Sequence, residues 1–421
     1  MSVKAKLPNL VSQFAQVIET LGAITPQSKI GIAVSGGGDS TAMMHMAARS
    51  LDPQRLHIVS VDHGLRPEAK DEIGVVTRQA NALGLQHTIL NWVWDQSGNL
   101  QAAARDGRFA LMREWADQNG IETLLLGHTE DDQAETFLLR LARGSGVDGL
   151  TGMARSDIRE GLRVARPLLG MSRDSLRDWL RDEGIEWCDD PSNEDTRFDR
   201  VRARQMYAQL ETLGLSRKRL LQTVDHMQAA HLSLQRAAHD FAHKHVRQDA
   251  GDLIFAPQAL DLELEDTPRR VMAAAFSWVA SQPYRPRFEN LLARVDQVRN
   301  GHKVTLAGCI LLPLPDGGAR LLREASATCG SVIGADALVH WDKRWQLTGP
   351  IGEALEIKAL GEGIAQCENW RETGFPRASL LASPSVWQGD RLIAAPIAGF
   401  SNGWTAQIVA DFHSRAFGIE D

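Results

Sequence analysis

The first half of the chain alternates between short apolar runs and longer stretches with helical periodicity. The apolar runs are residues 29–34, 57–61, 87–92 and 123–126, with a further candidate at 163–168. Turn residues and then helical patterns follow the runs, as at 41–50, 67–83 and 100–119. This order predicts βαβ crossovers and an α/β fold, a doubly wound, Rossmann-like parallel sheet. In such a fold, ligands bind at the carboxyl ends of the strands.

The pattern changes after about residue 213. Residues 215–246 read as one or two long helices, and 268–300 as two more, interrupted around 283–286. From about residue 332 the chain carries short strands, at 348–357, 392–396 and 405–410, separated by Gly/Pro turns. We therefore predict three domains: an α/β domain at 1–213, a mainly helical domain at 214–330 and a small α+β domain at 331–421.

Composition is that of a soluble globular protein, with 43% hydrophobic and 24% charged residues. No apolar run reaches the ~18–20 residues that span a bilayer, and the first ten residues lack the features of a signal peptide. The four cysteines are far apart and form no CxxC pair: Cys188, Cys309, Cys329 and Cys367. This spacing argues against a zinc site or disulfide framework and fits a reducing cytosol. Together with the lack of a membrane-spanning run, it predicts a cytoplasmic protein without a membrane partner.

The net charge of −7 conceals two basic clusters. Residues 197–219 hold seven basic side chains against two acidic ones, and residues 267–303 hold the same numbers. A nucleic acid responds to the local face rather than to the whole-chain sum, so an RNA partner is permitted. Solvated helix surfaces explain the clusters equally well.

A glycine-rich loop lies between the first predicted strand and the following helix. Its residues are Ser35, Gly36, Gly37, Gly38, Asp39 and Ser40. Glycines allow positive φ and close approach, so successive N–H groups can form an anion nest at the helix N-terminus, with the serine hydroxyls as further donors. No Walker lysine is present. A plain turn capped by Asp39 or Ser40 is the alternative, but the whole string in this context favours phosphate binding.

Asp62 and His63 close the second predicted strand. In dinucleotide-binding folds an acidic residue at such a strand end commonly meets the ribose hydroxyls. A turn carboxylate or N-cap explains Asp62 as well, and the sequence leaves both readings open.

The fourth strand leads into a helix whose start, residues 128–136, is strongly acidic. At 100° per residue, His128, Asp132 and Glu135 fall on one face, which we expect to point toward the ligand. We expect the opposite face, with Ala134 and Phe137, to cover the sheet. A capping box between Thr129 and Asp132 is the alternative reading. Since several carboxylates beside a triphosphate would repel it, we expect Mg²⁺ or a substrate ammonium to complete the site.

Together, the loop and the acidic helix resemble the PP-loop ATP pyrophosphatases, and specifically the tRNA(Ile)-lysidine synthetase family. The resemblance extends over about residues 25–205. Further matching segments are 61–66, Asn99 with Ala104 and Arg105, Arg108, 143–146, 166–168 and 190–193.

The resemblance implies a ligase that joins free L-lysine to C2 of the wobble cytidine of an isoleucine tRNA (CAU anticodon). ATP would first adenylate the tRNA, releasing pyrophosphate, and lysine would then displace AMP. The implied site residues are Asp39, His128, Asp132 and Glu135 for catalysis, Ser35–Ser40, Asp62 and His63 for ATP, Arg105 and Arg108 for lysine or the α-phosphate, and Arg200, Arg202 and Arg204 for tRNA. We assign Asp132 mainly to Mg²⁺ and Glu135 mainly to the lysine amine.

Two departures and two alternatives accompany this interpretation. Val201 stands where the family usually has asparagine, and the tail matches weakly, so tRNA recognition by residues 331–421 rests on analogy.

A PP-loop tRNA thiolase would share the adenylation but needs reactive cysteines, and Cys188 is the only cysteine before residue 309. The other alternative is a non-catalytic ATP-binding module. A homodimer is left open.

Overall fold

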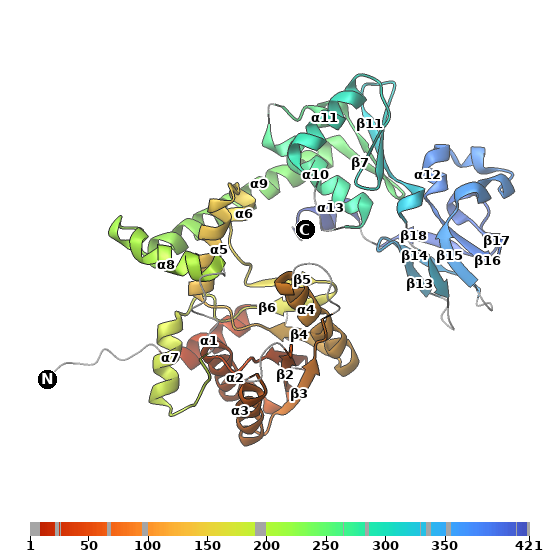
Figure 1. Ribbon diagram of the computed structural model, residues 1–421. Coiled ribbons are helices and arrows are strands. Elements are labelled where there is room, and N and C mark those ends of the chain that lie inside the picture. Colours follow the sequence, from red (N-terminus) through yellow and green to blue (C-terminus); the bar gives the residue numbers. More distant parts are fainter. Residues whose placement is uncertain are drawn as a thin grey trace. The chain divides into compact units, whose positions relative to one another are not determined.

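The computed structural model describes residues 9–21, 25, 27–64, 69–94, 100–189, 199–263, 265–282, 286–328, 330–333, 338–350, 355–409 and 411–418. The chain forms two compact units, Met1–Ala230 and His231–Asp421 (Figure 1). Their boundary falls within the 29-residue helix α9 (Arg217–His245). The division into three domains at residues 213 and 330 stays a prediction.

The N-terminal unit is built on a six-stranded sheet in the order β3-β2-β1-β4-β6-β5. The strands are β1 (Lys29–Ala33), β2 (Leu56–Asp62), β3 (Gln86–Asn91), β4 (Ile121–Leu125), β5 (Ser156–Arg159) and β6 (Leu162–Ala165). Strand β5 alone is antiparallel to its neighbour. The order reverses between β1 and β4, which is the switch point where ligands of such sheets bind.

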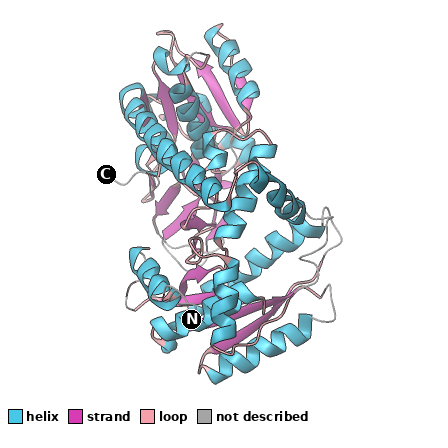
Figure 2. Ribbon diagram, turned by 90° about the vertical axis from the view of Figure 1, so that its left-hand side faces the viewer, coloured by secondary structure: helices cyan, strands magenta, loops and turns pink. Residues whose placement is uncertain are grey.

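Helices cover both faces of this sheet (Figure 2). The helices are α1 (Leu10–Thr20), α2 (Gly38–Ser50), α3 (Ala69–Ala82), α4 (Leu100–Asn119), α5 (Glu130–Ala142), α6 (Val147–Leu150), α7 (Arg173–Asp182) and α8 (Asp199–Thr212). Helices α1, α2, α3 and α7 share one core, and α4 forms the other. Trp115 of α4 packs directly on β1, since a Cβ on Gly31 would lie 2.9 Å from its ring. The predicted doubly wound α/β fold is confirmed.

The C-terminal unit contains a second core around a five-stranded antiparallel sheet, β7-β8-β11-β10-β9. Its elements are β7 (Val246–Asp249), β8 (Asp252–Phe255), β9 (Val304–Leu306), β10 (Cys309–Pro313), β11 (Ala319–Arg323), α10 (Asp266–Ala280) and α11 (Phe288–Arg299). The helices were predicted, but the sheet was not. Its strands are three to five residues long, and β11 is buried at every position, so no alternation marks it.

Two smaller antiparallel sheets complete this unit. One has the order β12-β15-β16-β17 and the other β13-β14-β18. The elements are β12 (Ser331–Ile333), β13 (Leu338–Trp341), β14 (Trp345–Thr348), β15 (Leu355–Ala359), β16 (Pro384–Gln388), β17 (Arg391–Ala394), β18 (Thr405–Ile408), α12 (Arg377–Leu381) and α13 (Phe412–Ala416). Among the described helices of the whole chain, none is long and apolar enough to cross a membrane.

Candidate active site

A cavity of about 680 Å³ lies at the carboxyl ends of β1, β2 and β4 in the N-terminal unit. Most of the predicted site residues line it: Ser35, Gly37, Gly38, Asp39, Ser40, His63, Arg108, His128, Asp132, Glu135, Arg200 and Arg204. Gly36, Asp62, Arg105 and Arg202 are not among the described lining residues. The sheet topology therefore gathers the glycine loop and the acidic helix at one place.

The glycine loop turns sharply at Gly36 and leads directly into helix α2. Gly36 adopts φ +90°, and a Cβ there would lie 3.3 Å from the Glu72 carbonyl oxygen. Ser40 fastens the loop, because its hydroxyl accepts from the Ser35 amide at 3.2 Å and donates to the Gly37 carbonyl at 3.0 Å. Helix α2 begins at Gly38, so its first amides have no partner within the helix and can bind an anion.

Asp132 serves the helix and the cavity at once. One carboxylate oxygen accepts from the Thr129 amide at 2.9 Å and from the Thr129 hydroxyl at 3.0 Å. The other oxygen lies 3.4 Å from Arg173 Nη2. The capping interpretation is therefore confirmed for one oxygen, while the other oxygen contacts Arg173 in the cavity and its role in the site stays a prediction.

The apolar face of α5 does not cover the sheet, contrary to our expectation. Ala134 and Phe137 pack against Leu220 and Val224 of α9 instead. Leu141 remains half exposed. Helix α5 therefore uses its apolar side to pack against α9 and against Tyr207 of α8.

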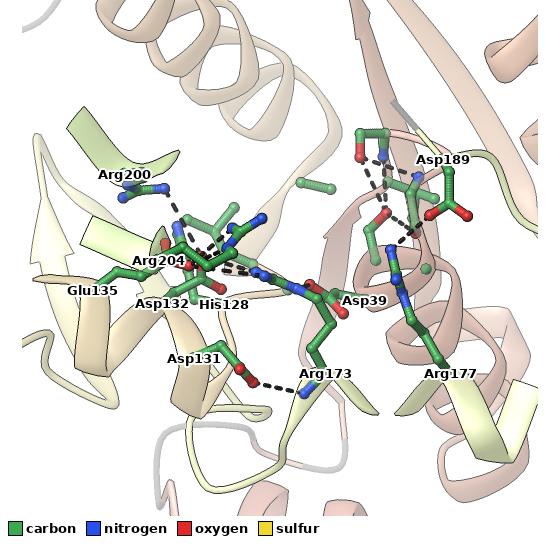
Figure 3. Close-up of a pocket in the computed structure, with 18 of the residues that line it drawn as sticks. Asp39, His128, Asp131, Asp132, Glu135, Arg173, Arg177, Asp189, Arg200 and Arg204 are labelled. Carbon is green, nitrogen blue, oxygen red and sulfur yellow. Dashed lines mark hydrogen bonds and ion pairs between the residues drawn. The ribbon is translucent and has the colours of Figure 1, made fainter. Parts of the chain in front are cut away.

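Arg173, which the sequence analysis missed, lies among the acids of the cavity (Figure 3). Its guanidinium is 3.0 Å from Asp39 Oδ2, 3.4 Å from Asp132 Oδ1 and 3.9 Å from Glu135 Oε1. Arg173 opens α7, where a cation opposes the helix dipole, but its partners come from α2 and α5, so no local pattern marks these contacts.

Arginines of α8 and α9 pair with the same acidic helix. Arg204 lies 2.9 Å from Glu135, and Arg200 lies 3.9 Å from Asp132. Arg217 holds Glu130 at 3.3 Å and Asp131 at 3.1 Å. The chain itself supplies guanidinium groups to these carboxylates, which the sequence did not lead us to expect, and a role for Mg²⁺ or a substrate ammonium stays a prediction.

Burial sets the protonation of the site. It lowers the pKa of His128 to about 4, so the imidazole is neutral at pH 7. Burial also raises the pKa values of Asp39 and Glu135, more than Arg173 and Arg204 respectively lower them. For Asp132, burial acts in the same direction, but the charge of Arg173 and the Thr129 amide outweigh it and lower the pKa.

Several buried atoms of the cavity residues have no hydrogen-bond partner in the described part of the chain, among them Asp39 Oδ1, His128 Nδ1, Glu135 Oε2 and Arg177 Nε. Buried polar atoms are rarely left unpaired, so their presence beside a cavity indicates a polar ligand. No group of three or more His, Cys, Asp or Glu side chains within the described ranges is arranged to hold a metal. Mg²⁺ on a nucleotide needs only one or two carboxylates, with the remaining ligands coming from phosphate and water.

The remaining predicted residues have local partners or neighbours. Asp62 Oδ1 accepts from the Gly64 amide at 2.8 Å, which makes it a turn carboxylate. Arg202 pairs with Asp199 on the exposed side of α8. Burial lowers the pKa values of Arg105 and Arg108, helped by nearby arginines. Val201 is buried. Residues 65–66, Asn99 and 190–193, part of the family resemblance, lie outside the described residues.

Cys188 lies in the cavity wall, which bears on the thiolase alternative. Its amide donates to the Gly36 carbonyl at 2.9 Å, so the backbone here has a structural role. Burial raises the pKa of its thiol, which keeps the thiol protonated and a poor nucleophile. Nothing about this cysteine favours sulfur transfer.

Comparison with known proteins agrees with this geometry. A family profile described as the PP-loop domain matches residues 7–210. A tRNA(Ile)-lysidine synthase of Ruegeria pomeroyi is 42% identical, over 91% of this chain and 92% of the relative. One of Wolbachia pipientis is 31% identical over 88% of each chain. A solved U34-tRNA thiolase from Methanococcus maripaludis aligns with a TM-score of 0.44 and 14% identity, over 52% of this chain and 78% of that one, too weakly to carry an argument. Given the extent of the sequence matches, the chain belongs to the tRNA(Ile)-lysidine synthase family.

Proposed function

We propose that the protein joins free L-lysine to C2 of the wobble cytidine in an isoleucine tRNA with a CAU anticodon, producing lysidine at the expense of ATP. One observation carries this proposal. The glycine loop lines the same cavity as Asp39, His128 and Glu135, each of which has one buried atom without a hydrogen-bond partner among the described residues. The identity of the tRNA and of the product is inferred from the relatives, which are named tRNA(Ile)-lysidine synthases.

The first step activates the cytidine. Its C2 oxygen attacks the α-phosphorus of ATP, and the bond between that phosphorus and the oxygen bridging to the β-phosphate breaks. Pyrophosphate departs with the electron pair. The loop amides around Gly37 and Gly38 bind the β- and γ-phosphates and stabilise the negative charge that develops on the leaving group.

The carboxylates nearest the loop fit a divalent cation bound to the triphosphate. Asp39 Oδ1 is buried and has no partner in the described part of the chain, and Asp132 offers the oxygen that its helix cap leaves free. These are the hard oxygen ligands that Mg²⁺ prefers, and a bound Mg²⁺ would neutralise phosphate charge. We assign this role to Asp39 and Asp132.

The second step requires lysine as a free amine. Glu135 is suited to bind the ammonium and take its proton, since its raised pKa makes it a stronger base than an exposed carboxylate. The amine attacks C2, the C2–O bond breaks and AMP leaves with the electron pair. Neutral His128, beside Asp132, can orient the reacting groups without adding charge.

Arginines and the C-terminal half serve binding in this proposal. Arg108 lines the cavity and is placed for the α-phosphate or the lysine carboxylate, with Arg105 one turn earlier on α4. We assign Arg200, Arg202 and Arg204, together with residues 214–330 and 331–421, to the tRNA.

Mass analysis of an isoleucine tRNA after incubation with ATP and lysine tests the function. We expect a gain of one lysine less one water, and AMP rather than ADP from α-labelled ATP. Replacement of oxygen by sulfur would favour a thiolase. An unchanged tRNA, with no AMP formed, would favour the non-catalytic module.

A further inference from the structure

Helix α7 presents two arginines to the cavity, one turn apart. Arg173 is engaged by Asp39, Asp132 and Glu135 at the acidic side. Arg177 lies four residues later, on the same face of the helix, and lines the cavity at the glycine loop. Arg173 therefore lies at the acidic side of the cavity, and Arg177 lies at the glycine loop (Figure 3).

Arg177 is in contact with the glycine loop. Its Cγ lies 3.6 Å from the position that a Cβ on Gly38 would occupy, so its aliphatic stem runs along the last glycine. Its Nη2 donates to Asp189 Oδ1 at 2.6 Å. Its Nε is buried and has no hydrogen-bond partner among the residues that the structure describes. The Nη2 donor of Arg177 is thus bound to Asp189, whereas its Nε donor is unused among the described residues.

The segment that carries Asp189 is attached to the loop. The Cys188 amide donates to the Gly36 carbonyl at 2.9 Å, and Gly37 and Cys188 form a parallel bridge. The Trp187 ring lies 3.4 Å from the Cβ position of Gly38, and its indole N–H donates to Asp189 Oδ1 at 3.4 Å. The glycine loop, residues 187–189 and Arg177 are therefore held together by direct contacts.

The chemistry of this loop calls for a cation. It lacks the lysine of a Walker loop, and backbone amides supply only partial charges. Cleavage between the α- and β-phosphates places a further negative charge on pyrophosphate. The acids of helix α5 are contacted by Arg173, Arg200, Arg204 and Arg217. In contrast, Arg177 contacts Asp189 beside the loop.

We propose that Arg177 binds the β- and γ-phosphates of ATP and stabilises departing pyrophosphate, and that Asp189 is its positioning residue. Guanidinium groups suit this task because they form paired, charge-assisted hydrogen bonds with phosphate oxygens. When the bond between the α-phosphorus and the bridging oxygen breaks, the electron pair moves to that oxygen, which leaves as part of pyrophosphate. The inference rests on the proposed α–β cleavage, but it is testable by binding alone.

The test compares ATP, pyrophosphate and AMP as ligands of the full-length protein by titration calorimetry, in one Mg²⁺-containing buffer and without tRNA. Arg177→Gln should weaken ATP and pyrophosphate binding about 10- to 100-fold and leave AMP binding unchanged. Arg177→Lys should lose less. Asp189→Asn should weaken pyrophosphate binding by a smaller factor, since it loosens the guanidinium without removing it.

Arg49→Gln is the matched control. Arg49 pairs with Glu183 at 2.8 Å and is 38% exposed, close to the 35% of Arg177, but it lies outside the cavity lining. It should bind all three ligands as the wild type does. Equal weakening of AMP and ATP in Arg177→Gln would make Arg177 a structural residue, and unchanged ATP binding would make it a surface partner of Asp189. Should Arg177→Gln not fold, the same criteria apply to Arg177→Lys. Failure of the proposed function would appear separately, as wild-type protein forming no AMP.

Discussion

Two regions of this protein bring arginines and carboxylates together, and only one of them has the features of an active site. In the N-terminal unit, Arg173 and Arg204 contact Asp39, Asp132 and Glu135 beside a cavity of about 680 Å³. In the C-terminal unit, Arg320 binds Asp252 at 2.8 Å and Asp249 at 2.7 Å, beside a space of only about 20 Å³.

The groups left without partners also differ. Beside the large cavity they include carboxylate and imidazole atoms of Asp39, Glu135 and His128 as well as Arg177 Nε. In the C-terminal cluster they are guanidinium Nε atoms of Arg320 and Arg344, while Asp252 also accepts a hydrogen bond from Ser379. Buried carboxylate atoms beside a large cavity can bind a cationic or metal-bound ligand, whereas ion pairs beside a space of about 20 Å³ hold the strands and their neighbours together. Ion pairs alone therefore do not identify the site.

The largest expected effect tests the structural role of the C-terminal cluster. Arg320→Met leaves Asp252 buried without its main counter-charge, which should cost about 3–5 kcal/mol of unfolding free energy. ATP affinity should not change. Arg247→Met, which removes an exposed partner of Asp249, is the control and should cost at most about 1 kcal/mol. Denaturant unfolding and calorimetry check both, and a loss of ATP binding in Arg320→Met would remove the distinction between the regions.

Asp39→Ala should have the opposite profile. We expect AMP formation to fall by about 100- to 1,000-fold, because the variant removes a carboxylate from the phosphate loop. Stability should stay near that of the wild type, since Arg173 keeps Asp132 and Glu135 as partners and burial of Asp39 is itself unfavourable. Asp117→Ala, an exposed partner of Arg113, controls for loss of an acid. A large loss of stability would place Asp39 with the structural ion pairs.

The contrast between the regions also explains what the sequence could predict. The loop and the acidic helix are contiguous strings, so local pattern was sufficient to find Asp39, His128, Asp132 and Glu135. Parallel strands of the predicted order then bring the two strings together, because their carboxyl ends meet at one edge.

Arg173 and Arg177 were missed because their role depends on tertiary structure. They lie on the amphipathic helix α7, which α6, β5 and β6 separate from the acidic helix α5 along the chain. The same reason applies to Arg320 and Asp252, which approach each other across paired strands β11 and β8. Pairings across sheets and between helices leave no periodic signal in one sequence.

Glu135→Gln addresses the division of labour within the cavity. The variant keeps the shape of the side chain but loses its charge. The free energy of lysine binding should therefore become less favourable by ~1–3 kcal/mol, as expected for a lost charge-assisted hydrogen bond. Adenylate formation should survive, since activation precedes lysine attack. Pyrophosphate exchange and lysine incorporation, measured on the same variant, separate the two steps. Equal loss of both, at unchanged lysine affinity, would assign Glu135 to the ATP site.

The last expected effect is a pH dependence of stability, and it concerns His128, the neutral member of the site. Its pKa of about 4 in the folded protein lies below the ordinary value of 6.5 that applies when the chain is unfolded. Between these values the unfolded chain binds more protons at this position, so wild-type stability should fall as the pH drops from 6.5 toward 4. One group contributes at most about 1.4 kcal/mol per pH unit. His128→Asn lacks this titration, so the difference between its stability curve and that of the wild type should be constant above pH 6.5 and change only below it. Curves that stay parallel down to pH 4 would mean that His128 titrates alike in both states, and the site would then carry an imidazolium beside Asp132 at mildly acidic pH.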